Sequence, residues 1–217
     1  MQQLNSITSQ TKIQLDIFEG IKEKEAIKFI QEYEPSEGWF GGFSGGKDSV
    51  VMKDIGTKAE TRKPIQWFYS ATGVDAPELV KFIKEYHPDV IFKRPKESFF
   101  NLIPKKGYPT KWTRWCCDKL KKDPTKDILL LHRLMGIRAE ESTRRAARGK
   151  IDTLGKWIIY KPIFNWLEWE IWNYIDSHNL PYCSLYDEGF DRLGCVVCPF
   201  LSGKKLKMHK QRRLGSF

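Results

Sequence analysis

The segment best suited to chemistry is the glycine-rich stretch Ser44–Ser49, which reads SGGKDS. Gly45 and Gly46 let the backbone turn tightly and bring its N–H groups close to phosphate oxygens. Lys47 adds positive charge, the two serines add hydroxyl donors, and Asp48 can hold a Mg²⁺ ion that bridges to the phosphates. A helix expected directly after the loop would aim its positive dipole end at the same place. All six residues together favour a nucleotide site over a ligand-free glycine turn.

The same stretch nearly matches a Walker A loop. Gly41 is followed by four residues and then by Gly46 and Lys47, as that pattern requires. The next residue should be Ser or Thr, whose hydroxyl ligates Mg²⁺, but Asp48 stands there and Ser49 comes one position late. An aspartate against phosphates would repel them unless a metal lay between. The Walker A interpretation therefore fails on chemistry.

Five cysteines form a second group of chemically capable residues. Cys116 and Cys117 are adjacent, whereas Cys195 and Cys198 form a C-x-x-C pair. A C-x-x-C turn can present two thiolates to one metal, and an adjacent pair is accommodated more easily on an iron–sulfur cluster, where each thiolate binds a different iron. Structural zinc and two unrelated buried pairs are the alternatives. Cys183 stands apart and is predicted to be a small core residue.

Composition limits the setting in which these groups work. The chain has 217 residues, with 37 Lys and Arg against 27 Asp and Glu, for a formal charge of +10. Such a charge fits an anionic partner without choosing among nucleotide, nucleic acid and acidic protein. The first twenty residues show no secretory signal, and no apolar stretch is long enough to cross a membrane. We therefore expect a cytoplasmic protein without a membrane partner, where cysteines serve metals or catalysis rather than disulfides.

The elements that must position these residues alternate between strand and helix. Periodicity predicts helices over about 12–33, over 49–60, over Pro77–His87, from Glu140 onward and over Trp166–Asn179. It predicts buried strands over Gly38–Phe43, Ile65–Ala71, Asp89–Arg94 and within Ile128–Arg138. Alternation at this spacing favours an α/β fold, a Rossmann-like parallel sheet with helices on both faces.

Several motifs resemble known families. SGGKDS resembles the PP-loop of the N-type ATP pyrophosphatases, in the adenine-nucleotide α-hydrolase superfamily of HUP-type folds. From Gly38 to Pro199 the chain resembles the phosphoadenylylsulfate (PAPS) reductase family, through the stretches TGVDAPELVKFI, CCDKLK, GIRAEESTRR, KPIFNWLEWEIWNYI and GCVVC. The resemblance divides the chain into an N-terminal helical segment (1–36), a PP-loop domain with a cysteine-ligated cluster (37–200) and a basic tail (201–217). It extends to phage-carried PAPS-reductase-like proteins and to sulfurtransferases of DNA phosphorothioation systems.

The resemblance also implies ligands. The loop residues Ser44, Gly45, Gly46, Lys47, Asp48 and Ser49 would hold the β,γ-pyrophosphate of ATP with Mg²⁺. Cys116, Cys117, Cys195 and Cys198 would ligate a 4Fe–4S cluster. Arg138 and Arg145 would contact phosphate or sulfate groups of the nucleotide, with Ser142 near them. Trp166 and Trp172 fall at helical spacing on an apolar face, which indicates core packing rather than ligand stacking.

Two departures from the assimilatory reductases guide the functional hypotheses. Those enzymes usually carry a modified loop, because APS and PAPS have no β,γ-pyrophosphate, and they attack with a cysteine of a C-terminal ECGLH motif. This chain keeps the whole SGGKDS loop, and its last cysteine is Cys198, which is assigned to the cluster. A reductase cycle would then need Cys183 or an external thiol as its nucleophile.

Three functions are therefore weighed. The favoured one is ATP-dependent adenylation and sulfur transfer, with Lys47, Asp48 and Arg138 as catalytic residues and a sulfur-donor protein as a partner. Its acceptor could be a nucleic acid, given the basic residues Lys105, Lys106, Lys111, Arg114, Arg144, Arg145 and Arg148, although a solvated basic face explains them as well. The second is an APS or PAPS reductase that releases sulfite. The third is a non-catalytic module that binds nucleotide and cluster.

Overall fold

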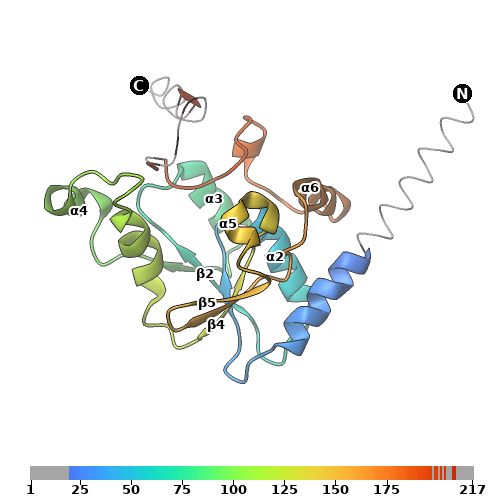
Figure 1. Cartoon of the computed structure of the whole chain (residues 1–217). Coiled ribbons are helices and arrows are strands. Elements are labelled where there is room, and N and C mark those ends of the chain that lie inside the picture. Colours follow the sequence, from blue (N-terminus) through green and yellow to red (C-terminus); the bar gives the residue numbers. More distant parts are fainter. Residues whose placement is uncertain (1–19, 197, 200, 202, 204–206, 209–217) are drawn as a thin grey trace, which may run out of the picture. The chain divides into compact units, whose positions relative to one another are not determined.

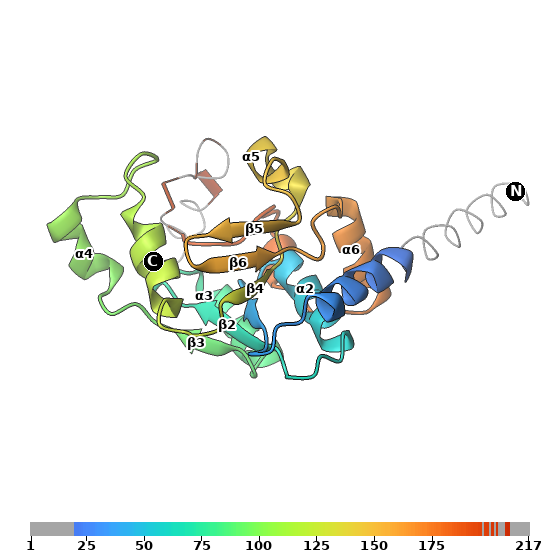
Figure 2. The ribbon, with the colours of Figure 1, turned by 60° about the horizontal axis from the view of Figure 1, so that its bottom comes forward.

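The computed structural model describes residues 20–196, 198–199, 201, 203 and 207–208. Its strands are β1 (Phe40–Gly42), β2 (Gln66–Ser70), β3 (Ile91–Lys93), β4 (His132–Met135), β5 (Ile151–Leu154) and β6 (Trp157–Tyr160). They form one six-stranded sheet in the order β3-β2-β1-β4-β6-β5 (Figure 2). The pairs β1–β4, β2–β3 and β4–β6 are parallel, and β5 pairs antiparallel with β6. The α/β fold with a mostly parallel sheet is thus confirmed, with an antiparallel edge strand that was not predicted.

The helices follow the strands as the alternation requires (Figure 1). They comprise residues 20–32, α2 (Lys47–Lys58), α3 (Pro77–Tyr86), α4 (Phe99–Lys106), α5 (Thr143–Ala146) and α6 (Glu168–Ser177), with the short turns η1 (Cys117–Lys122), η2 (Asp123–Thr125), η3 (Ala139–Glu141) and η4 (Ser184–Tyr186). The predicted first helix is confirmed over 20–32. Its remainder and most of the predicted basic tail lie outside the described residues. No described helix combines the length and apolarity needed to cross a membrane.

The chain divides into two compact units. The first comprises Met1–Gly42, Lys47–Gln66 and Leu130–Leu180, and the second comprises Phe43–Gly46, Trp67–Leu129 and Pro181–Phe217. In the first unit α2 packs against α6. Val50, Val51 and Ile55 of α2 are buried, because the predicted apolar positions share one face of the helix.

The second unit contains α3, α4 and η1. Helix α3 begins at Pro77, where the missing N–H costs nothing, and it buries Leu79, Phe82 and Ile83 at helical spacing. A separate apolar cluster joins α4 and η1; its buried members are Val74, Phe99, Leu102, Trp115 and Leu120. Cys116 and Cys195 are partly buried and pack against this cluster.

Candidate functional site

The glycine-rich loop occupies the turn between β1 and α2, as the sequence predicts. Gly45 has φ +72°, and a Cβ there would lie 2.5 Å from Leu79 Cδ1, so only glycine fits. The Gly46 N–H donates to Ser44 Oγ at 3.4 Å and tightens the turn. Asp48 lies in the first turn of α2. The strand–turn–helix geometry that anion binding at a helix N-terminus requires is therefore present.

Lys47 is held by α6. The residue is only 4% exposed, and its Nζ lies 2.9 Å from Glu168 Oε1. The same Nζ lies 5.6 Å from the ring centroid of Trp172, within the range of a cation–π contact. These contacts hold the charge of Lys47 at the start of α2, paired with the half-exposed carboxylate of Glu168.

Arg138 follows β4 and reaches back to the loop. Its Nε donates to Asp48 Oδ1, and one terminal nitrogen donates to Glu140 Oε2 and, at 3.4 Å, to the carbonyl of Trp166. Burial opposes the charged form, but Asp48 and Glu140 outweigh it and raise the pKa of Arg138 above its ordinary value. The guanidinium is 4% exposed and stays charged. The structure thus joins two predicted catalytic residues, and Arg138 orients Asp48.

Gly136 explains how Arg138 comes so close. A Cβ on Gly136 would lie 2.7 Å from the carbonyl oxygen of Asp48, so any larger residue would push the end of β4 away from the start of α2. Glycine is therefore needed at position 136 because the end of β4 and the start of α2 lie so close together, and not because of an unusual backbone dihedral angle.

Ser142 and Arg145 lie on the next turn. Ser142 caps α5, because its Oγ accepts from the Arg145 N–H at 3.3 Å. The guanidinium of Arg145 pairs with Glu141, and Glu141 also accepts from the Arg138 N–H at 3.1 Å. Glu141 therefore links the two predicted arginines. Sequence reasoning missed Glu140, Glu141 and Glu168; the spacing of Glu141 and Arg145 by four residues was the one available signal.

The four predicted metal ligands lie in the second unit. Cys116 and Cys117 lie at the start of η1. Cys195 forms an isolated antiparallel bridge with Asp75, and the Cys198 N–H donates to the Cys195 carbonyl at 3.3 Å, which closes the C-x-x-C turn. The hydroxyl of Thr72, which follows β2 in the chain, also contacts this turn: its Oγ1 lies 3.6 Å from Cys195 Sγ.

Burial and neighbouring charge raise the pKa of two of these thiols. Burial raises the pKa of Cys116 to about 11, and negative charge on Cys117 and Cys195 adds to the rise. Burial likewise raises the pKa of Cys195, with Asp75 and Cys198 adding to it and Lys121 opposing it. Among the described residues no three His, Cys, Asp or Glu side chains are arranged to hold a metal ion. Thiolates are ligands that both iron and zinc accept, and a bound metal ion would counter the rise in thiol pKa.

The remaining predictions concern packing. Trp166 is 4% exposed and its ring packs against Tyr174 at a centroid distance of 5.5 Å, which confirms its predicted core role. Trp172 is half-buried beside Lys47, so it is a wall of the lysine site as well as a packing residue. Cys183 is 1% exposed, as predicted for a small core residue.

Comparison with known proteins identifies the family. Residues 39–201 match the phosphoadenosine phosphosulfate reductase domain, and the chain belongs to that family. An uncharacterized protein of Methanocaldococcus jannaschii is 34% identical over 194 residues, which is 82% of this chain and 40% of that protein. An adenosine 5'-phosphosulfate reductase of Staphylococcus epidermidis is 30% identical over 166 residues, which is 71% of this chain and 68% of that enzyme. The chain thus spans well under half the length of its archaeal relative.

Solved structures agree on the fold. A PAPS reductase of Candida auris, in a phosphate complex, gives a TM-score of 0.62 at 21% identity over 80% of this chain and 87% of that one. An FMN adenylyltransferase of Candida glabrata, with FMN and an ATP analogue, gives 0.63 at 17% identity over 84% and 65%. The U34-tRNA thiolase NcsA of Methanococcus maripaludis, with its [4Fe–4S] cluster, gives 0.50 at 15% identity over 91% and 74%. At these identities the likeness establishes the fold alone.

Proposed function

We propose that the chain is an ATP-using sulfur-transfer enzyme of the PAPS reductase family. The observation that carries the proposal is the complete SGGKDS loop at the turn between β1 and α2, with a buried lysine and an arginine-held aspartate at its helical end. A loop of that composition suits two linked phosphates, which ATP has and APS and PAPS lack.

Each loop residue has a distinct role in this proposal. The backbone N–H groups at the start of α2 would hold the terminal phosphates, and Lys47 would neutralise the pyrophosphate as it leaves. Asp48, oriented by Arg138, would hold Mg²⁺, which supplies Lewis-acid stabilisation of phosphate charge when bound. Glu168 shares Lys47 with the nucleotide and would lose part of that contact on binding.

The reaction balances without an oxidant or reductant. An oxygen of the acceptor attacks the α-phosphorus of ATP, the bond to the β-phosphate oxygen breaks, and pyrophosphate leaves with its electron pair. Hydrosulfide then attacks the carbon that carries the adenylated oxygen, the carbon–oxygen bond breaks, and AMP leaves. The acceptor has exchanged oxygen for sulfur.

Cys116, Cys117, Cys195 and Cys198 are proposed to hold a 4Fe–4S cluster, with one thiolate for each iron. The support is that Cys116 and Cys195, from the two stretches, pack against one apolar cluster, and that the distant tRNA thiolase has a [4Fe–4S] cluster. Soft thiolates suit iron–sulfur clusters and zinc alike, so zinc remains the competing occupant.

The test is pyrophosphate release. Anaerobically reconstituted protein is incubated with ATP, Mg²⁺, hydrosulfide and a nucleic-acid or small-molecule acceptor. We expect acceptor-dependent pyrophosphate release that Lys47→Ala reduces about 100-fold or more, as expected for loss of a charge that stabilises the leaving group. Lys53→Ala, on the same helix but outside the loop, is the control and should retain release. Absence of pyrophosphate with every acceptor would contradict the proposal.

A second candidate, an APS or PAPS reductase, is favoured by the similarity to the adenosine 5'-phosphosulfate reductase of Staphylococcus epidermidis. Because Cys183 is 1% exposed, its thiol could not reach a nucleotide, and the nucleophile would have to be external. Sulfite release from APS or PAPS with an added thiol would establish this function. Tight nucleotide binding with neither sulfite nor pyrophosphate would instead identify a non-catalytic module.

A further inference from the structure

The segment Ser98–Cys117 of the second unit exposes aromatic rings and positive charges together. Phe100, Tyr108 and Trp112 are 66%, 58% and 93% exposed, and the segment contains no Asp or Glu. Its basic residues are Lys105, Lys106, Lys111 and Arg114. A single exposed ring is ordinary, but three exposed rings in a segment that carries only positive charges suit a partner that is both flat and anionic.

Two of the rings are fixed by the core beneath them. Phe99 and Trp115 are buried and stacked, with centroids 5.7 Å apart and planes at 23°. Phe100 and Tyr108 each meet Phe99 edge to face, at 5.5 and 6.2 Å. Trp115 Nε1 also donates to the Gly107 carbonyl at 3.2 Å, which anchors the turn before Tyr108. The exposed rings are therefore preorganised rather than loose.

Trp112 is held by its own turn. Thr110 Oγ1 accepts from the N–H groups of Trp112 at 3.2 Å and Thr113 at 3.0 Å, and the Thr110 N–H donates to the Thr113 carbonyl at 3.2 Å. These bonds set the backbone of the turn while the indole stays almost fully in solvent. A preset turn lowers the backbone entropy that is lost when a ligand stacks on the indole.

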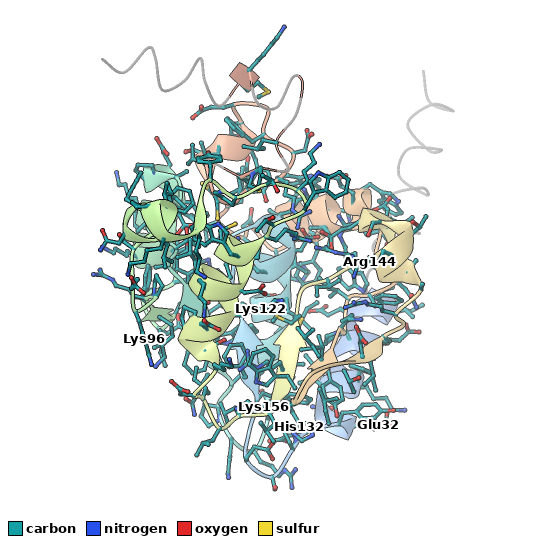
Figure 3. The ribbon with its side chains drawn as sticks, turned by 60° about the vertical axis from the view of Figure 1, so that its left-hand side comes forward. Glu32, Lys96, Lys122, His132, Arg144 and Lys156 are labelled. Atoms are coloured by element: carbon teal, nitrogen blue, oxygen red, sulfur yellow. The ribbon has the colours of Figure 1, made fainter. Side chains whose placement is uncertain are left out.

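The charges lie on the same segment as the rings. Lys106 and Lys111 are exposed, and Lys105 pairs with Glu97. Lys96, just before the segment, is exposed too and lies at the edge of the view in Figure 3. Arg114 extends a terminal nitrogen to 3.8 Å from Cys117 Sγ, so the basic segment leads directly to a proposed cluster ligand.

We propose that Ser98–Cys117 is a binding surface for single-stranded nucleic acid. Trp112, Tyr108 and Phe100 stack on unpaired bases, while the exposed basic residues of the segment neutralise phosphates. A duplex hides its base faces, and an acidic peptide offers charge without rings to stack, so neither uses both features. That this strand is also the sulfur acceptor rests on the proposed function; the binding itself does not.

The test measures binding of a fluorescent single-stranded oligonucleotide, as RNA and as DNA, to the full chain by anisotropy. Trp112→Ala is expected to weaken binding about five- to hundredfold, the range for losing one base–aromatic stack. Lys111→Ala is expected to weaken it most at low salt, making the fall of log K with log salt less steep by about 0.7 for one lost phosphate contact. Both residues are exposed, so both variants should keep the melting temperature of the parent chain.

Matched controls come from α3 of the same unit. Tyr86→Ala and Lys84→Ala remove an exposed ring and an exposed lysine outside the segment, and they should bind like the parent chain. The proposal is overturned if Trp112→Ala binds like the parent chain or if the α3 controls lose as much binding. It is also overturned if duplex binds more tightly than single strand, or if polyglutamate at equal charge competes.

The surface and the proposed function can fail separately. If Trp112→Ala loses oligonucleotide binding while no acceptor supports pyrophosphate release, the surface stands and the ATP chemistry is wrong. If pyrophosphate release with a small acceptor is normal but Trp112→Ala binds oligonucleotide like the parent chain, the surface is wrong and the ATP chemistry stands.

Discussion

At the scale of single residues, Arg138 both stabilises the fold and orients Asp48. Its guanidinium contacts Asp48, Glu140 and the Trp166 carbonyl while almost wholly buried. Arg138→Ala would remove the counter-charge that the carboxylates of Asp48 and Glu140 share. We expect the free energy of unfolding to fall by about 2–3 kcal/mol in urea denaturation, somewhat less than for a fully buried pair because Glu140 can turn to water. Mg²⁺-dependent ATP binding should weaken as well, because Asp48 loses its orientation.

Arg148 provides the comparison. It pairs with Asp152 at 3.3 Å, but its side chain is 45% exposed. Arg148→Ala should therefore cost less than about 1 kcal/mol and leave ATP binding intact. Arg138→Lys keeps the charge but not the planar fork, so it should recover only part of the loss. Equal losses for the two alanine variants would show that the ion pairs of Arg138 stabilise the fold no more than an exposed pair does.

At the scale of elements, the sequence predicts what is local and misses what is brought together by packing. The loop, the start of α3 at Pro77 and the strand–helix order follow from short patterns. The β5–β6 hairpin was missed because its four-residue strands are too short for a reliable period of two. Helix α4 was missed because it contains Pro104, which ordinarily ends a helix. Glu168 was missed because only the packing of α6 against α2 brings it to Lys47.

The helix of residues 20–32 is tied to α2 and α6 by a polar network. Lys58 Nζ donates to Glu23 Oε1 at 2.7 Å and to Tyr174 Oη at 2.8 Å. The hydroxyl of Tyr174 has one hydrogen to offer to Glu23, at 2.9 Å, or to Asp54, at 2.7 Å. Burial and both carboxylates raise the pKa of Tyr174, so it remains a neutral donor. One tyrosine thus connects three helices.

Because of this network, we expect the helix of residues 20–32 to lose stability at acid pH. Burial favours a higher pKa for Glu23, but hydrogen bonds from Lys58 and Tyr174 outweigh it and hold the pKa below the ordinary value of 4.5. A lowered folded pKa gives stability that is present above about pH 4.5 and is lost as the pH falls through the folded value. Glu23→Gln should cost about 1–2 kcal/mol at pH 7. The free energy of unfolding of Glu23→Gln, measured in urea, should then change less than that of the parent chain as the pH falls below about 4.5.

Glu32 lies on the same helix, is exposed and is labelled in Figure 3. Glu32→Gln should leave the stability and its acid dependence as in the parent chain. Hydrogen exchange of residues 20–32 gives the local readout, because release of this helix should speed exchange there before the sheet opens. If Glu23→Gln and the parent chain lost stability in parallel down to pH 3, the network would not govern the acid response.

At the scale of the whole molecule, the four thiols decide how the chain depends on metal. They come from two stretches far apart in the sequence, so a shared metal centre would join two segments whose Cys116 and Cys195 already pack against one apolar cluster. A ligand held by the folded state alone stabilises that state by mass action. The strength of this coupling depends on whether one centre takes all four sulfurs or separate ions take pairs.

Anaerobic reconstitution with iron and sulfide should give four irons and four sulfides per chain if one cubane takes one thiolate from each cysteine. It should also raise the melting temperature by about 5 °C or more, since saturation at a hundredfold excess over Kd adds about 2.7 kcal/mol. Cys117→Ala and Cys195→Ala should each lower the iron content and the melting temperature of the reconstituted protein. Cys183→Ser changes a thiol outside the quartet and should keep the iron content. One zinc per chain, with the same thermal shift and no iron retained, would show that the quartet is a structural staple instead.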